Sequence, residues 1–298
     1  MRYVILLICL LSLAVLADTE KRVFNENALN INFESSRPVT FVGKKSLEGS
    51  GLSSAPMMYP ADTAGLFLVS ILTHAAVSGG VQKAKLNQEQ EEANKVLEPY
   101  RPHIANINEA FLARHTNSQG ISAVIDKMQI LLGDKRLENS RWQVNVVPVF
   151  AMTQNQSSFL IYNKLTFIDR SLTAKDKKKV KKLKKGQPNP NEHLVVIVSD
   201  PVLTDNNADF WLRENAKAFN DSIKSLYIES FHLGVARHFG ELKNADAKQV
   251  TIRYLENGVK KIERGYVISQ TCRRTVFESL AGEIKSVPNL DFPSCASA

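Results

Sequence analysis

The hydrophobic and polar positions of this chain have different periodicities in different segments. Between residues 59 and 100, an almost wholly apolar half is followed by an almost wholly charged half. Asp62 and Thr63 offer a helix N-cap before this stretch, and Pro99 offers a stop after it. The pattern predicts one long helix from about Thr63 to Leu97, with Gly79–Gly80 as a hinge.

The apolar half of this predicted helix, Ala64–Val81, is 18 residues long and is interrupted by polar residues such as His74. This length lies at the boundary between a membrane-spanning segment and a helix buried in a protein core. Three interpretations are open: a core helix, a surface helix that meets a membrane or a partner, and a helix inserted in a membrane. We favour the core helix, because interrupted apolar runs of this length usually belong to globular cores.

Three further segments have apolar residues at helical spacing. Two are short, Ile104–His115 and Gly120–Gly133, and a longer one begins at an N-cap, either Asn207 or Asp209, and ends near Gly240. The apolar stripe of the longer segment consists of Phe219, Ile223, Leu226, Tyr227, Phe231, Gly234, Val235 and Phe239. We therefore expect two short helices and a second long helix.

Other segments are rich in β-branched and aromatic residues, which favours strands. They cover residues 38–43, 142–152, 158–169 and 193–201. A short polar turn joins 142–152 to 158–169, and a long polar segment joins 158–169 to 193–201. This predicts two hairpins, the second with an unusually long loop. Pro148 indicates an edge position or a bulge in the second of these strands.

Residues 248–270 alternate in polarity around Asn257–Gly258, a dipeptide that favours a tight hairpin because both positions tolerate a positive φ. The alternation predicts that Ile252, Tyr254 and, across the turn, Ile262 share partial burial. It also predicts that Arg253, Glu256, Lys260 and Glu263 face water.

Together these patterns predict an α+β fold, in which a largely antiparallel sheet of hairpins packs with two long helices and shorter N-terminal helices. The chain has no regular alternation of strands and helices, and no Gly-rich turn follows a predicted strand. A doubly wound nucleotide-binding sheet is therefore disfavoured.

The first residues match the three regions of a secretory signal peptide: Arg2, an apolar stretch from Val4 to about Leu16, and small Ala17 before a polar start. We expect a signal peptide over residues 1–17, a polar and partly extended leader over 18–58, and an α+β body over 59–298 with a Lys-rich loop inserted at 173–191. An uncleaved anchor is the alternative. Export places the protein in the periplasm or in association with the outer envelope of a bacterium.

Export also changes how the three cysteines are interpreted. Cys9 leaves with the signal peptide, and an even pair, Cys272 and Cys295, remains in an oxidising compartment. We predict a disulfide between them, which would stabilise the fold by about 3 kcal/mol. The alternative is that the two thiols are not bridged.

Most of the net charge of +8 comes from one segment. Eight lysines and Asp176 give residues 175–185 a charge of +7, so the rest of the chain is nearly neutral once Arg2 is removed. These lysines are Lys175, Lys177, Lys178, Lys179, Lys181, Lys182, Lys184 and Lys185. They predict contact with an anionic lipid, a glycan or an envelope protein, and peripheral membrane association. The run lacks aromatic residues that stack on bases, so specific nucleic-acid binding is not expected. A solvated loop kept for solubility is the alternative.

Catalytic and metal-binding motifs are absent from the sequence: it has no nucleophile elbow, no His-Glu-x-x-His and no phosphate loop. The best acidic cluster is Asp200, Asp205 and Asp209, which we assign to loop chemistry and helix capping.

The histidines do not suggest a site either. His232 and His238 are six residues apart, on different sides of one helix, and His103, His115 and His193 lie near loops. We therefore predict no metal and no cofactor. The sequence favours a non-catalytic binding or structural protein of the envelope. The alternative is an exported hydrolase whose catalytic residues, as yet unknown, are scattered in the sequence.

Overall fold

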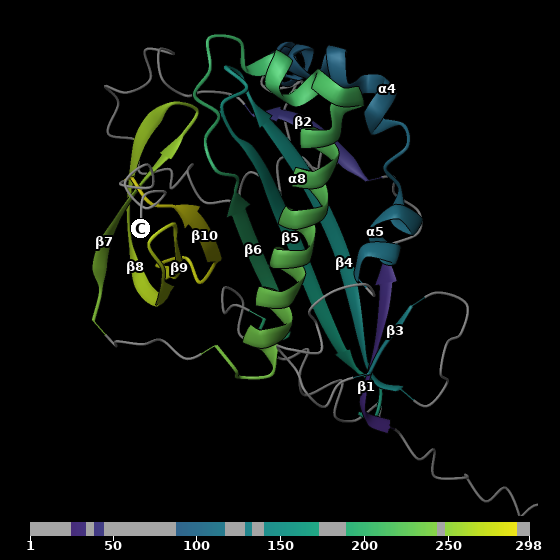
Figure 1. Cartoon of the computed structure of the whole chain (residues 1–298). Helices are drawn as coiled ribbons and strands as arrows, with labels where there is room; N and C mark the ends of the chain where they lie inside the picture. The colour runs from purple at the N-terminus through teal and green to yellow at the C-terminus, as the bar shows by residue number, and fades with distance from the viewer. Residues whose placement is uncertain are drawn as a thin grey trace, which may run out of the picture.

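A twisted β-sheet lies at the centre of this protein in the computed structural model (Figure 1). The structure describes residues 25–33, 39–44, 88–116, 129–132, 140–172, 189–242 and 248–290. Ten strands of this part of the chain join in the order β3-β1-β4-β5-β6-β10-β9-β8-β7, and β2 pairs with β4. The strands are β1 (Asn25–Phe33), β2 (Thr40–Lys44), β3 (Gln129–Leu132), β4 (Ser140–Thr153), β5 (Phe159–Asp169), β6 (Glu192–Val198), β7 (Val250–Glu256), β8 (Val259–Gln270), β9 (Arg274–Ser279) and β10 (Ile284–Pro288). The predicted α+β class is confirmed.

The sheet is mixed, so the prediction of a largely antiparallel sheet was too simple. Strand β1 runs parallel to both β3 and β4, β2 runs parallel to β4, and β10 runs parallel to β6. These partners are far apart in the sequence, as in the pair of Asn30 with Gln143. A hairpin can be predicted from the residues of its turn, whereas two parallel strands are not joined by a short turn that could be identified in the sequence.

The two predicted hairpins around β5 are present. Strands β4 and β5 pair from Trp142 with Asp169 to Met152 with Phe159, and β5 pairs with β6 on its other side. Pro148 lies between Val146, the last partner of β1, and Val149, the first partner of β2. The side of β4 that faces β1 and β2 is unpaired at this point, which suits a residue without an N–H group.

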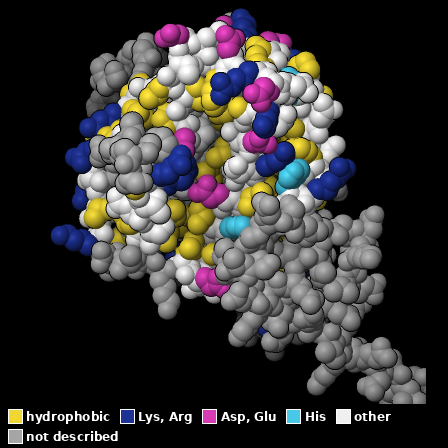
Figure 2. Space-filling model, in the orientation of Figure 1, with side chains coloured by type: hydrophobic (Ala, Val, Ile, Leu, Met, Phe, Trp, Pro, Cys, Tyr) yellow, Lys and Arg dark blue, Asp and Glu magenta, His cyan; other side chains and the backbone are white. Residues whose placement is uncertain are grey.

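The long helix α8 (Asn207–His238) crosses one face of the sheet over β5 and β6 (Figure 1). Its buried side includes seven members of the predicted stripe, and Phe239 is partly buried just beyond its end. The N-cap is Asn206, whose side chain accepts a hydrogen bond from the Asp209 N–H, rather than Asn207 or Asp209 as predicted. The solvent-facing side carries mixed charges (Figure 2). Among them, Lys224 forms an ion pair with Asp221.

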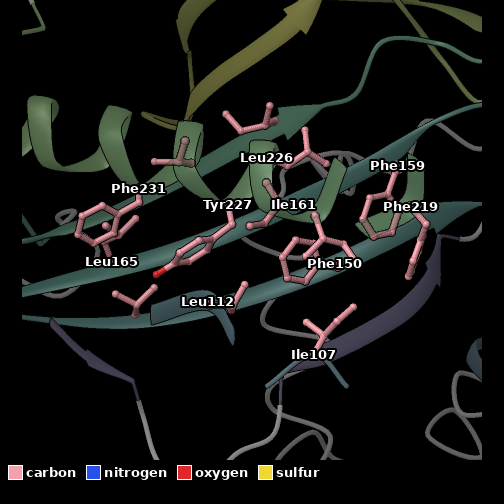
Figure 3. Packing of buried hydrophobic residues seen from close by; sticks show 14 of the residues in the cluster. Ile107, Leu112, Phe150, Phe159, Ile161, Leu165, Phe219, Leu226, Tyr227 and Phe231 are labelled. Atoms are coloured by element: carbon pink, nitrogen blue, oxygen red, sulfur yellow. The ribbon is translucent and has the colours of Figure 1, made fainter. Parts of the chain in front are cut away.

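Alternate residues of β5 point into two different cores. Phe159, Ile161 and Leu165 pack beneath α8 (Figure 3), whereas Leu160 and Tyr162 point to the opposite face. The second core also contains Ile252 and Tyr254 of β7, Phe277 of β9, and Val42 of β2. Strands β7–β9 therefore bend over the face opposite α8, and Tyr254 forms a bridge with Asn289 just after β10. Because strands such as β6 are buried on both faces, they are apolar without alternation.

A break near its N-terminus divides α8. Arg213 is extended, and the next three residues, Glu214, Asn215 and Ala216, have φ values of 52°, 55° and 57°. This left-handed conformation is costly for residues that have a Cβ atom. Beyond the break the helix continues to His238.

The long helix predicted from about Thr63 to Leu97 is described only from residue 88. Residues 88–94 are helical, but the next residues form a 3-10 turn, η2 (Lys95–Tyr100), followed by α4 (Arg101–Ile104) and α5 (Glu109–Thr116). The apolar segment Ala64–Val81 lies outside the described residues. The helix predicted over Gly120–Gly133 was wrong at Gln129–Leu132, which form β3, because a short apolar run suits either structure.

The β7–β8 hairpin turns at Asn257 and Gly258, with φ values of 57° and 73°, as predicted. The predicted faces were right for Ile252 and Tyr254, which are buried, and for Arg253 and Lys260, which are exposed, but wrong for Ile262 and Glu256. Ile262 is 61% exposed, whereas Glu256 is only 7% exposed. Directly opposite residues share a face of the sheet, and Ile262 lies opposite Arg253. The register therefore turns Ile262 outward and brings Glu256 inward with Ile252 and Tyr254.

Candidate functional site

The lysine loop is inserted at the end of the β5–β6 hairpin. Its lysines, at 175, 177–179, 181, 182, 184 and 185, lie outside the described residues, but the two strands that hold the loop are described. Thr166 pairs with Glu192 at the end of the ladder, and the Phe167 N–H donates to the Asn191 carbonyl over 2.8 Å. The ends of the loop are thus held next to each other by the sheet itself.

Charges at the base of the loop neutralise one another. Asp169 forms an ion pair with Arg141 at 3.1 Å, and Glu192 forms one with Lys164 at 2.8 Å. Burial alone would raise the pKa of Asp169, but hydrogen bonds from Ser171 and Arg141 outweigh burial and lower it. Both carboxylates at the base are therefore engaged by cations of β4 and β5.

A pair of histidines lies beside this base. His193 of β6 and His238 at the end of α8 place Nε2 and Nδ1 3.3 Å apart, although 45 residues separate them. The His238 ring stacks on Phe167 with 3.9 Å between centroids, and Trp142 packs edge-on against it. Two neutral imidazoles suit this contact, because one nitrogen can donate a proton and the other can accept it.

The environment of the pair keeps it neutral. Burial lowers the pKa of His193 to about 4, with a further contribution from the Arg237 guanidinium and an opposing one from Glu192. Burial and the neighbouring His193 lower the pKa of His238 to about 4, against the effect of Asp169. The contact between these two residues was not predicted, because His193 was assigned to a loop and His238 was compared only with His232.

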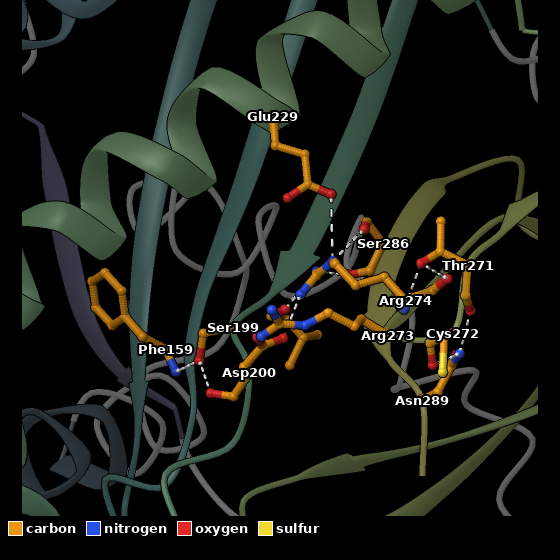
Figure 4. Close-up of polar contacts among 11 residues, drawn as sticks. Phe159, Ser199, Asp200, Glu229, Thr271, Cys272, Arg273, Arg274, Ser286 and Asn289 are labelled. Carbon is orange, nitrogen blue, oxygen red and sulfur yellow. Dashed lines mark hydrogen bonds and ion pairs between the residues drawn. The ribbon is translucent and has the colours of Figure 1, made fainter. Parts of the chain in front are cut away.

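Arg274 joins three parts of the fold (Figure 4). Its guanidinium donates to Asp200 Oδ1 at 3.0 Å, to the Val198 carbonyl at 2.8 Å and to Ser286 Oγ at 3.1 Å. Glu229 of α8 lies 3.6 Å from its Nε. Arg274 therefore ties β9 to the end of β6, to β10 and to the helix.

The predicted acidic cluster is divided among structural roles. Asp200 binds Arg274 and also Arg273, whose guanidinium lies 3.1 Å away. Asp209 belongs to the N-terminus of α8, where its backbone N–H is capped by Asn206. Asp200 therefore serves in ion pairs, which were not predicted, and Asp209 lies in the first turn of α8 without being its N-cap.

A second set of charges is buried between the two layers of the sheet. Lys44 of β2 pairs with Glu256 of β7 at 2.6 Å. Lys285 of β10 pairs with Glu263 of β8 at 2.7 Å, and Glu283 lies 3.3 Å from the same ammonium. The inward turn of Glu256 and Glu263, which the sequence analysis missed, gives both carboxylates these partners.

The pKa values of Lys44 and Lys285 indicate the charge state of this buried set. Burial alone would lower the pKa of Lys44, but Tyr162 and Glu256 raise it above the usual range. Burial likewise opposes the charge on Lys285, but Glu263 and Glu283 raise its pKa. Both lysines are therefore protonated and engaged. They act as ionic links between strands and are unsuited to act as nucleophiles.

The other predicted residues are placed as follows. Cys272 lies in the turn before β9, and Cys295 and His74 lie outside the described residues. In the described part, no group of three or more His, Cys, Asp or Glu side chains is arranged to hold a metal ion. None of the described helices is both long and apolar enough to span a bilayer.

The chain matches no family model, no curated protein and no solved structure.

Proposed function

We propose that this protein is an exported, non-catalytic binding protein of the bacterial cell envelope. The lysine loop, residues 173–191, contacts an anionic envelope component, and the α+β body is the scaffold that holds it. The partner is an anionic lipid, a glycan or an acidic envelope protein. The observation that carries this proposal is the closed β5–β6 ladder at the base of the loop.

The ladder supports a role for the loop outside the fold. Two antiparallel strands that meet as closely as Thr166 and Glu192 can be joined by a turn of about two to five residues. The inserted lysines are therefore not required to close the hairpin. Strand β5 is also internal to the sheet, with β4 on one side and β6 on the other, so its place does not depend on the loop.

The charges at the base support a partner that is external to the hairpin. Asp169 and Glu192 are already paired with Arg141 and Lys164, so these carboxylates do not serve as counter-charges for the lysines. Near a negatively charged surface, each lysine contributes about 1 kcal/mol of binding, and the effect falls off over roughly 10 Å at 0.1 M salt.

The predicted signal peptide over residues 1–17 supports export, and export supports a disulfide between Cys272 and Cys295. The Asn289 side chain donates to the carbonyls of Thr271 and Cys272 at 2.8 Å and 2.9 Å. The end of β10 thus lies next to Cys272, and Cys295 follows Asn289 by only six residues. Six residues of extended chain span up to about 20 Å, which is ample for closure.

The test is to replace the eight lysines of residues 175–185 by serine in the mature protein. We expect the thermal unfolding midpoint to stay nearly unchanged and retention on anionic vesicles at low salt to be lost. A control variant should retain binding; it replaces by serine the exposed cations Lys95, Arg101, Arg114, Arg213, Lys217, Lys248 and Arg273. Unchanged retention of the loop variant would exclude the loop as the contact.

Export is tested by fractionating cells that make the native protein. Comparing osmotic-shock release, a high-salt wash of membranes and detergent extraction distinguishes a free periplasmic protein from a salt-sensitive peripheral one. A requirement for detergent would instead implicate the segment Ala64–Val81 or an uncleaved signal.

A further inference from the structure

The β7–β8 hairpin sorts its side chains onto two faces of very different character. Its inner face, which covers the second core, contains Ile252, Tyr254, Glu256, Val259, Lys261 and Glu263. Its outer face is formed by three directly opposed pairs, Thr251 with Arg264, Arg253 with Ile262, and Leu255 with Lys260. In Figure 1 this hairpin lies at the side of the molecule away from α8.

The outer face carries positive charge that its own strands do not balance. Arg253, Lys260 and Arg264 are all exposed, and no carboxylate of β7 or β8 shares this face. None of the three side chains forms a hydrogen bond or an ion pair within the part of the chain that the structure describes. The acidic side chains of the hairpin point inward, where Glu256 forms an ion pair with Lys44 and Glu263 forms one with Lys285.

Exposed aliphatic side chains accompany these cations. Ile262 is 61% exposed and Leu280 is 59% exposed, and they are two of three large hydrophobic residues that are this exposed in the described residues. Leu280 directly follows Ser279, the partner of Gly265, so the ladder places it close to Arg264. Two aliphatic side chains therefore flank one of the three cations.

The face has a clear boundary. Farther along the same ladder, Tyr266 pairs with Glu278, and Glu278 forms an ion pair at 2.8 Å with Arg237 of α8. That carboxylate is already neutralised and lies on the side toward the helix. Arg253, Lys260, Arg264, Ile262 and Leu280 thus form a separate patch, which we call the hairpin patch.

We propose that the hairpin patch binds the surface of an anionic lipid bilayer. Three like charges on neighbouring positions of a small sheet repel one another, and an external anion relieves that repulsion. A bilayer surface offers several headgroup charges in one plane, which suits an open strand face. Its acyl boundary accepts exposed aliphatic side chains, which an anionic glycan would leave in water.

The hairpin patch is separate from the lysine loop, which is inserted between β5 and β6. The two surfaces can therefore be tested independently. From the usual contribution of a basic residue near an anionic membrane, the three cations together should change vesicle affinity by roughly a hundredfold.

The experiment measures co-sedimentation of the mature protein with vesicles of phosphatidylcholine and phosphatidylglycerol in a 7:3 ratio at low salt. It uses a background in which the eight loop lysines are replaced by serine, and a second background in which they are intact. The patch variant is Arg253→Glu, Lys260→Glu and Arg264→Glu. The control variant, Arg114→Glu, Lys217→Glu and Lys248→Glu, changes the net charge equally at other exposed positions.

We expect the patch variant to lower vesicle affinity roughly a hundredfold in the background with the loop lysines intact, and the control variant to change it less than about threefold. A second variant, Ile262→Asn with Leu280→Asn, should weaken vesicle binding without weakening binding to heparin. Equal affinities of the patch and control variants would overturn the proposal, and so would a second variant that binds vesicles as tightly as its parent. If only the replacement of the loop lysines weakens vesicle binding, the loop proposal is supported and the hairpin-patch proposal is refuted.

Discussion

Gly43 of β2 lies directly against the backbone of Ala93 in the helical segment 88–94. A Cβ atom built at Gly43 would be 1.7 Å from the Ala93 carbonyl oxygen. Two side chains of the same segment bond this glycine: its N–H donates to Asn94 Oδ1 at 2.8 Å, and its carbonyl accepts from Gln90 Nε2 at 3.0 Å. The segment thereby covers the outer edge of β2, which would otherwise expose unpaired backbone groups.

Gly43→Ala should therefore destabilise the protein by about 3 kcal/mol, because the methyl group meets a backbone atom that cannot rotate away. Urea unfolding measures the change. As a control, Gly240→Ala places a Cβ with nothing within 4 Å at a φ of 76°, and should cost only about 1 kcal/mol. Equal costs at the two positions would mean that the contact with Ala93 is not tight.

Stability should decrease as the pH falls from about 6.5 to 4, because of His193 and His238. Their pKa values in the folded protein, about 4, lie below the ordinary value of 6.5. The unfolded chain therefore takes up protons first, and the stabilisation, which is complete above pH 6.5, is lost through this window. Allowing for partial exposure, each histidine should contribute about 1 kcal/mol.

The measurement is urea unfolding at several pH values from 7.5 to 4.5. In the double variant His193→Gln and His238→Gln, the loss of unfolding free energy on acidification should be smaller than in the native protein. The difference is the amount that the two histidines contribute. His103→Gln, a substitution outside the pair, should leave the pH dependence as it is. A double variant whose stability falls as steeply as that of the native protein would contradict this prediction.

Arg274→Met should destabilise the fold by about 3 kcal/mol. The side chain is only 23% exposed, and its loss leaves the Val198 carbonyl, Ser286 and part of Asp200 without a donor. Its neighbour Arg273 also binds Asp200, but its side chain is 63% exposed, so Arg273→Met should cost less than about 1 kcal/mol. Thermal unfolding of the two variants tests this, and similar losses would refute the distinction.

Glu214→Gly should stabilise the protein by about 0.5–1 kcal/mol, because glycine adopts the φ of 52° at this break in α8 without steric cost. Lys217→Gly, three residues later and equally exposed, should have the opposite effect and destabilise by about 1 kcal/mol, since it lies in regular helix. Chemical denaturation of both variants compares the two positions. Destabilisation by both would mean that Glu214 is helical in solution.

Cys272 and Cys295 should be joined in protein purified from an exporting cell. Mass spectrometry of a peptide digest without reductant should contain the linked pair, and reduction should lower stability by about 3 kcal/mol. The double variant Cys272→Ser and Cys295→Ser should match the reduced protein and no longer respond to reductant. Detection of both thiols in the unreduced protein would refute the bridge.

The sequence by itself determined the local parts of this fold. The turn at Asn257–Gly258, the hairpins around β5 and the buried stripe of α8 were predicted, because each depends on residues close together in the chain. The lysine-rich segment was also located between the two strands that hold it.

Tertiary structure decided the rest, because contacts between distant residues leave no periodic signal. The parallel pairing of β1 and β2 with β4 was not predicted, and neither was the contact between His193 and His238. In β7 and β8, only Ile262, Glu256 and Glu263 were assigned to the wrong face, because the register turns Ile262 outward and lysines from distant strands pair with the two carboxylates inside. The second core covers the side of Ile252 and Tyr254, and this leaves Arg253 and Ile262 outside.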